Sequence, residues 1–225
     1  MLMNLVNNKP KTYTVYLFSV ISLGIFLISV QAAVMKCSEW QGLIAGLLLM
    51  VLAVPLHLLA RKRPSAYVFS FLLNFIACGF SVSAYYLTEK IPANLSVMFF
   101  SAIPAVIILL LVYLMLQIFP KKTAISAAAA ANAVLLAAAA VLWAMTGRLS
   151  FSFGFFCLLI SLFSVCVFGI TNNHDEQPVL RNISYGSFGA FVIITAVVIV
   201  LITEGDVLDI SDIFTGNDRK KKKQQ

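Results

Sequence analysis

The chain has 225 residues, of which 61% are hydrophobic and only 11% are charged, and its formal net charge at pH 7 is +7. A water-soluble domain of this size is nearer half apolar and a quarter charged, and its core is too small to hide such an excess of apolar residues. The composition excludes a soluble enzyme, a disordered chain and a nucleic-acid-binding domain as descriptions of the whole chain. It predicts an integral membrane protein.

Seven segments are long and apolar enough to cross a bilayer as helices, which takes about 20 residues each. Their continuous apolar runs differ from the alternating strands of a membrane barrel, which are about 10 residues long. The sequence therefore predicts an all-α, polytopic helix bundle that forms one transmembrane domain over residues 1–203, followed by a tail over residues 204–225. The predicted spans are Tyr13–Met35, Trp40–Ala60, Ala66–Leu87, Met98–Phe119, Thr123–Thr146, Ser150–Thr171 and Ser187–Thr203.

The orientation follows from the basic residues, because Lys and Arg collect in cytoplasmic loops. With the N-terminus inside, eight Lys and Arg residues lie in the N-terminal tail and loops on the inner side, and three lie in loops on the outer side. The N-terminus is therefore predicted to be cytoplasmic. Short loops and a plain hydropathy pattern suggest a bacterial cytoplasmic membrane as the location.

The number of crossings has an alternative. Seven crossings place the basic run Arg219–Lys223 outside, whereas a six-crossing arrangement, in which the alanine-rich segment Thr123–Thr146 does not span, returns it to the inside. Seven crossings are favoured because Trp40 and Trp143 then both lie at the outer interface, and tryptophan concentrates at membrane interfaces.

Small residues predict how the helices pack, since close contact replaces the hydrophobic effect between helices in lipid. The second span carries Gly42 and Gly46 four residues apart, a spacing typical of closely packed helices. The fifth span contains twelve alanines, and such a smooth helix is expected to lie centrally, with larger neighbours around it.

Two polar stripes follow the third and sixth spans, at steps of three and four residues that keep each stripe on one helical face. The simpler interpretation is hydrogen bonding between helices; the functional one is a substrate cavity between the third, fifth and sixth spans. Asn74 is the first residue to test, because a buried amide needs partners that lipid cannot provide. The candidate cavity or packing residues are Ser70, Asn74, Cys78, Ser81 and Tyr85 in the third span, Asn132 in the fifth, and Cys157, Ser161 and Ser164 in the sixth, where Gly154 and Phe168 extend the stripe.

The sequence lacks the residues that several membrane-protein functions require. No Asp, Glu, Lys or Arg lies within any predicted span, which argues against a carboxylate-driven proton antiporter, a voltage sensor and a retinal protein. His57, near Arg61, is interpreted as a structural or interfacial histidine, and His174, beside two acidic residues, as part of a solvated loop. The four cysteines form no C-x-x-C pair, and no hydrolase, zinc-protease or P-loop motif occurs. We therefore expect no enzymatic activity, no cofactor and no metal site.

The tail accounts for much of the positive charge, since Arg219–Lys223 contributes five of the basic residues. It is interpreted as a solubilising tail, with a short amphipathic helix on the bilayer as the alternative. The net charge is therefore no evidence for nucleic-acid binding.

Three functions remain open. The first is a small permease-like or substrate-binding membrane subunit that takes a small-molecule ligand, which the two polar stripes suggest. The second is a non-catalytic accessory subunit that assembles or regulates other membrane subunits, which the short loops and the lack of an ionisable site suggest. The third is a channel. In each case the lipid bilayer is a partner of the chain and nucleic acid is not.

Overall fold

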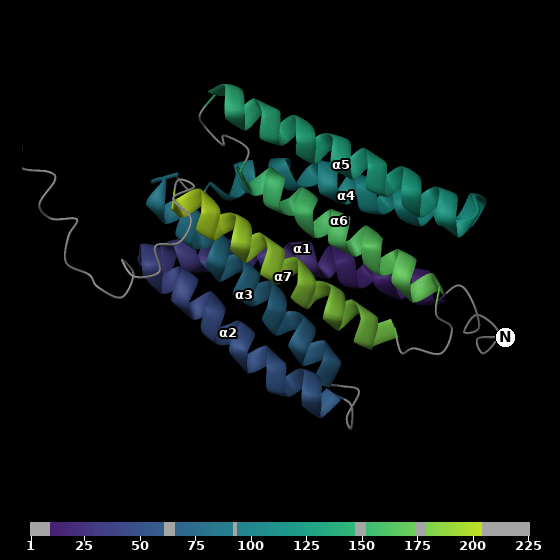
Figure 1. Ribbon diagram of the computed structural model, residues 1–225, viewed down its shortest axis with the longest axis horizontal. Coiled ribbons are helices and arrows are strands. Elements are labelled where there is room, and N and C mark those ends of the chain that lie inside the picture. Colours follow the sequence, from purple (N-terminus) through teal and green to yellow (C-terminus); the bar gives the residue numbers. More distant parts are fainter. Residues whose placement is uncertain (1–9, 61–65, 92–93, 147–151, 174–178, 204–225) are drawn as a thin grey trace, which may run out of the picture.

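The computed structural model describes residues 10–60, 66–91, 94–146, 152–173 and 179–203. These residues form seven α-helices and no β-strand (Figure 1), so the predicted all-helical membrane bundle is confirmed. The helices are α1 (Pro10–Lys36), α2 (Glu39–Ala60), α3 (Ala66–Thr88), α4 (Leu95–Ile118), α5 (Lys121–Thr146), α6 (Ser152–Asn173) and α7 (Val179–Ile202).

Six of these helices are long and apolar enough to cross a membrane. The remaining helix, α6, has an apolar part of 17 residues, Phe153–Gly169. At 1.5 Å per residue this part is about 25 Å long, which is at the lower end of what spans a bilayer. The alanine-rich helix α5 is among the six, with the apolar stretch Lys121–Met145, so the six-crossing alternative removes a helix that is long enough to span.

The residues at which α4 begins and ends are set by the local sequence. The Asn94 side chain caps α4 by accepting a hydrogen bond of 3.0 Å from the backbone amide of Ser96. Such a cap satisfies one of the amides that have no partner in the first turn of a helix. At the other end, the chain becomes extended at Phe119, and Pro120 follows, which cannot continue the hydrogen-bond pattern of α4.

Helix α7 begins eight residues before the predicted span, at Val179 instead of Ser187. The predicted loop Asn172–Gly186 is therefore wrong over most of its length. Polar residues lower the hydropathy of this stretch, but Asn182 and Ser184 are 7% and 0% exposed. Because their side chains face protein and not lipid, they do not prevent the helix from forming within the bundle.

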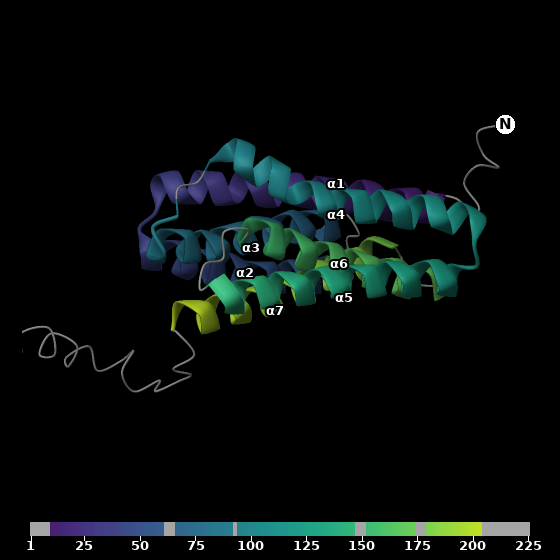
Figure 2. The same cartoon turned by 90° about the horizontal axis from the view of Figure 1, so that it is seen from above.

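Successive helices run in opposite directions, so Pro10 and Ile202 lie at opposite ends of the bundle (Figure 1). We call the end at which α1, α3, α5 and α7 begin the basic end, because Lys121, Lys122 and Arg181 lie there. Helix α3 packs against α1, α2 and α7, and α6 packs against α1, α4, α5 and α7. These two helices occupy the middle of the bundle, between α1 and α4 on one side and α2, α5 and α7 on the other (Figure 2).

Helix α5 lies at an edge of the bundle, so the prediction of a central position is wrong. It packs against α4 and α6 through a narrow face that holds Ala124, Ala128 and Asn132. Only 11% of its span is buried, against 67% for α3. Alanine has no polar group, so a smooth alanine-rich surface is compatible with lipid; the middle of the bundle is taken by helices with larger side chains.

Helix α2 packs almost entirely against α3, and its two glycines face that helix. A Cβ atom on Gly42 would lie 2.9 Å from the Phe80 carbonyl oxygen, and one on Gly46 would lie 2.8 Å from the Ala77 carbonyl oxygen. Both distances are shorter than ordinary van der Waals contact, so the two backbones can approach this closely because glycine has no side chain.

Candidate functional site

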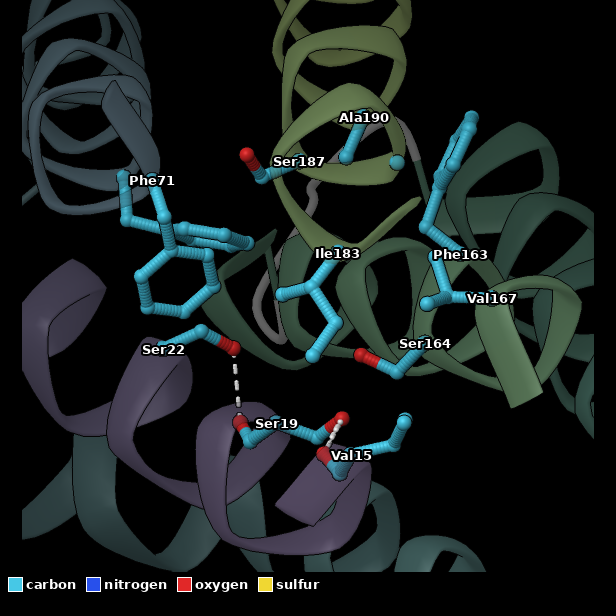
Figure 3. Close-up of a pocket in the computed structure, with 12 residues that line it drawn as sticks. Val15, Ser19, Ser22, Phe71, Phe163, Ser164, Val167, Ile183, Ser187 and Ala190 are labelled. Atoms are coloured by element: carbon cyan, nitrogen blue, oxygen red, sulfur yellow. Dashed lines mark hydrogen bonds between the residues drawn. The ribbon is translucent and has the colours of Figure 1, made fainter. Parts of the chain in front are cut away.

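A small cavity of about 20 Å³ lies between α1, α3, α6 and α7, in the half of the bundle nearer the basic end (Figure 3). Its polar lining consists of Ser19 and Ser22 from α1, Ser164 from α6 and Ser187 from α7. Apolar side chains, among them Phe71, complete the wall. A cavity of this volume has room for about one water molecule.

The hydroxyl protons of these four serines are already in use. Ser19 donates to the Val15 carbonyl oxygen at 2.8 Å and Ser22 to that of Ser19 at 2.6 Å, as the dashed lines in Figure 3 mark. On the other wall, the Ser164 hydroxyl donates to the carbonyl oxygen of Ile160 at 3.0 Å. The Ser187 hydroxyl donates to the carbonyl oxygen of Ser184 at 2.7 Å. A hydroxyl has one proton and two lone pairs, so these side chains can offer only acceptors to a molecule in the cavity.

Asn74 joins α3 to α7 directly behind the cavity. Its amide nitrogen donates to the Ser187 hydroxyl oxygen at 2.8 Å and to the Ser184 carbonyl oxygen at 3.4 Å. Its amide oxygen is buried and has no hydrogen-bond partner. Leaving a buried acceptor unsatisfied is unfavourable, so this oxygen is available to accept a hydrogen bond from a bound water or ligand.

His57 extends this polar contact to α2. One ring nitrogen, Nδ1, lies 3.1 Å from the Ala53 carbonyl oxygen and also contacts the Ser70 hydroxyl of α3. The other, Nε2, lies 3.4 Å from the Ser184 hydroxyl of α7. We call the group formed by His57, Ser70, Asn74, Ser184 and Ser187 the His57 cluster; it joins α2, α3 and α7 near the basic end.

Aromatic rings enclose the imidazole. The ring centroids of Tyr185 and Phe188 on α7 lie 5.1 and 5.7 Å from that of His57. Because the His57 side chain is only 9% exposed and lies in the last turn of α2, it is buried in the contact between helices, which fits the interpretation as a structural histidine.

Three of the candidate residues from the sequence belong to the cluster or the cavity: Ser70, Asn74 and Ser164. The others lie elsewhere. Ser81 faces Gly46 of α2, and Tyr85 packs against Phe156 of α6 with their ring centroids 6.2 Å apart. The remaining candidates, Cys78, Asn132, Cys157 and Ser161, are buried, and the side-chain polar atoms of Asn132 and Ser161 have no partner.

The cavity is therefore not between the third, fifth and sixth helices as predicted. Helix α5 packs against α4 and α6, and the lining comes instead from α1, α3, α6 and α7. Sequence reasoning also missed Ser184, which lay in the predicted loop, and Ser187, which stood at the first position of the last span. The signal that could have found them is the three-residue spacing of Ser184 and Ser187, which continues the helical pattern upstream of that span.

The residues that the structure describes hold no group of three or more His, Cys, Asp or Glu side chains that could bind a metal ion. His174 with its two acidic neighbours, the basic run Arg219–Lys223 and the rest of the tail lie outside the described residues. Comparison of the chain with protein-family models, with curated proteins and with solved structures gave no match.

Proposed function

We propose that this integral membrane protein is a permease-like, non-catalytic subunit that binds a small solute with hydrogen-bond donors in the cavity between α1, α3, α6 and α7. The observation that carries the proposal is the chemistry of the lining: the four serine hydroxyls have their protons engaged and can only accept further hydrogen bonds. Asn74 does not line the cavity, but it donates to Ser187 and keeps a buried oxygen without a partner. Such a surface favours water, ammonium or an amine over a solute that can only accept hydrogen bonds.

Solute entry requires the helices to move, because the cavity has room for about one water molecule. Helix α7 is the wall best suited to move. Its residues Ile183, Gly186, Ser187 and Ala190 form one side of the cavity, and the hydrogen bonds that hold this part of the helix to α3 come from Asn74. In the proposed orientation, with the N-terminus in the cytoplasm of a bacterium, the cavity lies in the half of the bundle nearer the cytoplasmic side, where the basic loops lie.

Thermal stability in detergent tests the proposal. We expect ammonium or methylammonium to raise the melting temperature of the wild type, and tetramethylammonium, which has no hydrogen-bond donor, to have no effect. Asn74→Leu and Ser187→Ala should abolish the stabilisation. Ser83→Ala is the matched control. The Ser83 hydroxyl donates to the Phe80 carbonyl oxygen over a distance of 2.6 Å, and neither residue lines the cavity. Equal effects of all three solutes, or no effect of any of them, would contradict the proposal.

A second candidate function is an accessory subunit that docks onto a transmembrane helix of another membrane protein through α5. A stripe of small side chains with alternating steps of three and four residues runs along α5, and each of them is exposed: Thr123, Ser126, Ala130, Ala133, Ala137, Ala140 and Ala144. Small residues at this spacing let two helices pack closely in lipid. The large apolar side chains of α2, such as Val51 at 65% exposed, suit lipid better.

Pull-down in a mild detergent separates the two functions. If α5 docks to a partner, Ala137→Leu should reduce recovery of that partner, and Val51→Leu on the exposed face of α2 should not. Recovery of the protein alone, together with solute-dependent stabilisation, would favour the permease-like function. Solute flux into liposomes that contain only this chain would further separate a channel or permease from an accessory subunit.

A further inference from the structure

The chain has two histidines, and one of them, His57, is an ionisable residue within a helix that can span the membrane. Ionisable residues at such positions are rare because burial of their charge is unfavourable, and they commonly mark a proton or ligand path. Histidine is also the side chain whose charge ordinarily changes between pH 5 and 8. Its contacts decide which form of the imidazole this bundle holds.

Those contacts fit a neutral imidazole. The Ala53 carbonyl oxygen can only accept, so Nδ1, at 3.1 Å, carries the proton and donates it. The remaining nitrogen, Nε2, then accepts from the Ser184 hydroxyl at 3.4 Å. In this state α7 is joined to α2 through Ser184 and to α3 through Asn74.

Among the described residues, no acidic side chain lies beside the imidazole to balance a positive charge on it. The titratable group that faces it is the phenol of Tyr185 on α7, and the ring of Tyr67 on α3 lies behind that of Tyr185, 6.4 Å from it. The charged residue of α7 in this region is Arg181, one turn before Ser184 and of the same sign. The acidic residues of α2 and of the end of α3, Glu39 and Glu89, stand at the other end of the bundle, and α7 contains none. Asp175 and Glu176 precede α7 in the sequence and lie outside the described residues. A buried charge without a partner is strongly unfavourable.

We propose that His57 is a proton-binding site whose protonation releases the first turns of α7 from α2 and α3. Nε2 takes up a proton from the water at the basic end, and the hydroxyl of Ser184 must then turn to accept from it instead of donating. The buried imidazolium gains hydration when α7 moves away, and this gain favours the released form. Ser187, one turn further along α7, is held by Asn74 and lines the cavity. Release of these turns therefore opens the cavity, a consequence that rests on the proposed function, whereas proton binding and helix release do not.

The helix contacts of α7 are intact in what we call the closed form and broken in the released form. The pH dependence of the equilibrium between the two forms follows from the number of protons that each binds. The released form exposes His57 to water and binds more protons than the closed form, so the closed form is favoured at higher pH and loses stability as the pH falls. If the exposed imidazole titrates near about pH 6.5, lowering the pH from about 7.5 to about 5.5 shifts the equilibrium toward the released form about tenfold.

Amide hydrogen exchange of the full chain in lipid nanodiscs measures this equilibrium without any ligand. Exchange rates in residues 179–190 are divided by the intrinsic rate at each pH. We expect about a tenfold loss of protection at the lower pH in the wild type and in His174→Gln, which changes the other histidine. His57→Gln keeps an amide that can hydrogen-bond but cannot be protonated, so its protection should not depend on pH.

A pH response that persists in His57→Gln, or a wild type whose protection is the same at both pH values, would overturn the proposal. Should His57→Gln fail to fold, the imidazole of His57 can be followed by nitrogen-15 NMR in His174→Gln, where it is the only histidine. If the midpoint of the imidazole titration coincides with the midpoint of the change in amide protection, the proposal is supported. If the two midpoints differ, the proposal is refuted. A solute screen without a hit at pH 7.5 leaves this result unaffected, so the two proposals fail separately.

Discussion

Replacing Gly46 with alanine tests the contact that holds α2 in the bundle. The added Cβ would lie 2.8 Å from the Ala77 carbonyl oxygen and 3.1 Å from the Ser81 amide nitrogen. Both are backbone atoms of α3, so the helices must separate by about 0.6 Å to reach an ordinary contact distance, which forfeits a quarter to a half of the affected dispersion energy. Because α2 packs almost entirely against α3, no other helix can compensate.

Gly24→Ala is the matched control, because a Cβ on Gly24 would meet no atom within 4 Å. Both variants gain the same helix propensity, about 1 kcal/mol, so their difference isolates the overpacking penalty of about 1–3 kcal/mol. With about 3 °C for each kcal/mol, Gly46→Ala should melt about 3–9 °C below Gly24→Ala in the same detergent. If Gly46→Ala melts at or above the control, α2 does not lie on α3 as described here.

Three further results are expected. If all seven helices cross the membrane, a reporter fused after the C-terminus should be active on the side opposite to one fused at the N-terminus; activity on the same side would contradict seven crossings. Asn132→Leu should raise the melting temperature, because both polar atoms of the buried Asn132 amide lack partners and each unsatisfied group is unfavourable by about 1–3 kcal/mol. Asn74→Leu should lower it, because the Asn74 amide nitrogen has partners on α7; a fall in both variants would contradict the hydrogen-bond assignment.

Much of the fold could be predicted from the sequence, because the width of the bilayer sets the length of each apolar run. That argument fails where a polar stretch is shielded by protein. The first turns of α7 were assigned to a loop because Arg181, Asn182 and Ser184 interrupt the apolar run, yet Asn182 and Ser184 are buried against neighbouring helices. Hydropathy describes a residue's preference for lipid, and it does not say whether the residue meets lipid.

The candidate site was less predictable, because it depends on the register between helices far apart in the chain. Asn74 was identified from its own chemistry, since a buried amide needs partners. Its partners Ser184 and Ser187 lie 110 and 113 residues away. The sequence places His57 near Arg61 and hence near an interface, but only the packing of α2 and α7 shows that its ring is enclosed. The position of α5 was missed for the same reason, since an alanine-rich surface fits both a helix interface and lipid.

The central claim is that a polar contact between α3 and α7 holds the wall of the cavity in place. A double-mutant cycle with Asn74→Leu and Ser187→Ala, measured by reversible unfolding in detergent, tests it most directly. We expect a coupling energy of about 0.6 to 1.7 kcal/mol, the average and the maximum found for hydrogen bonds between membrane helices. Effects of the two substitutions that add to within about 0.3 kcal/mol would contradict it.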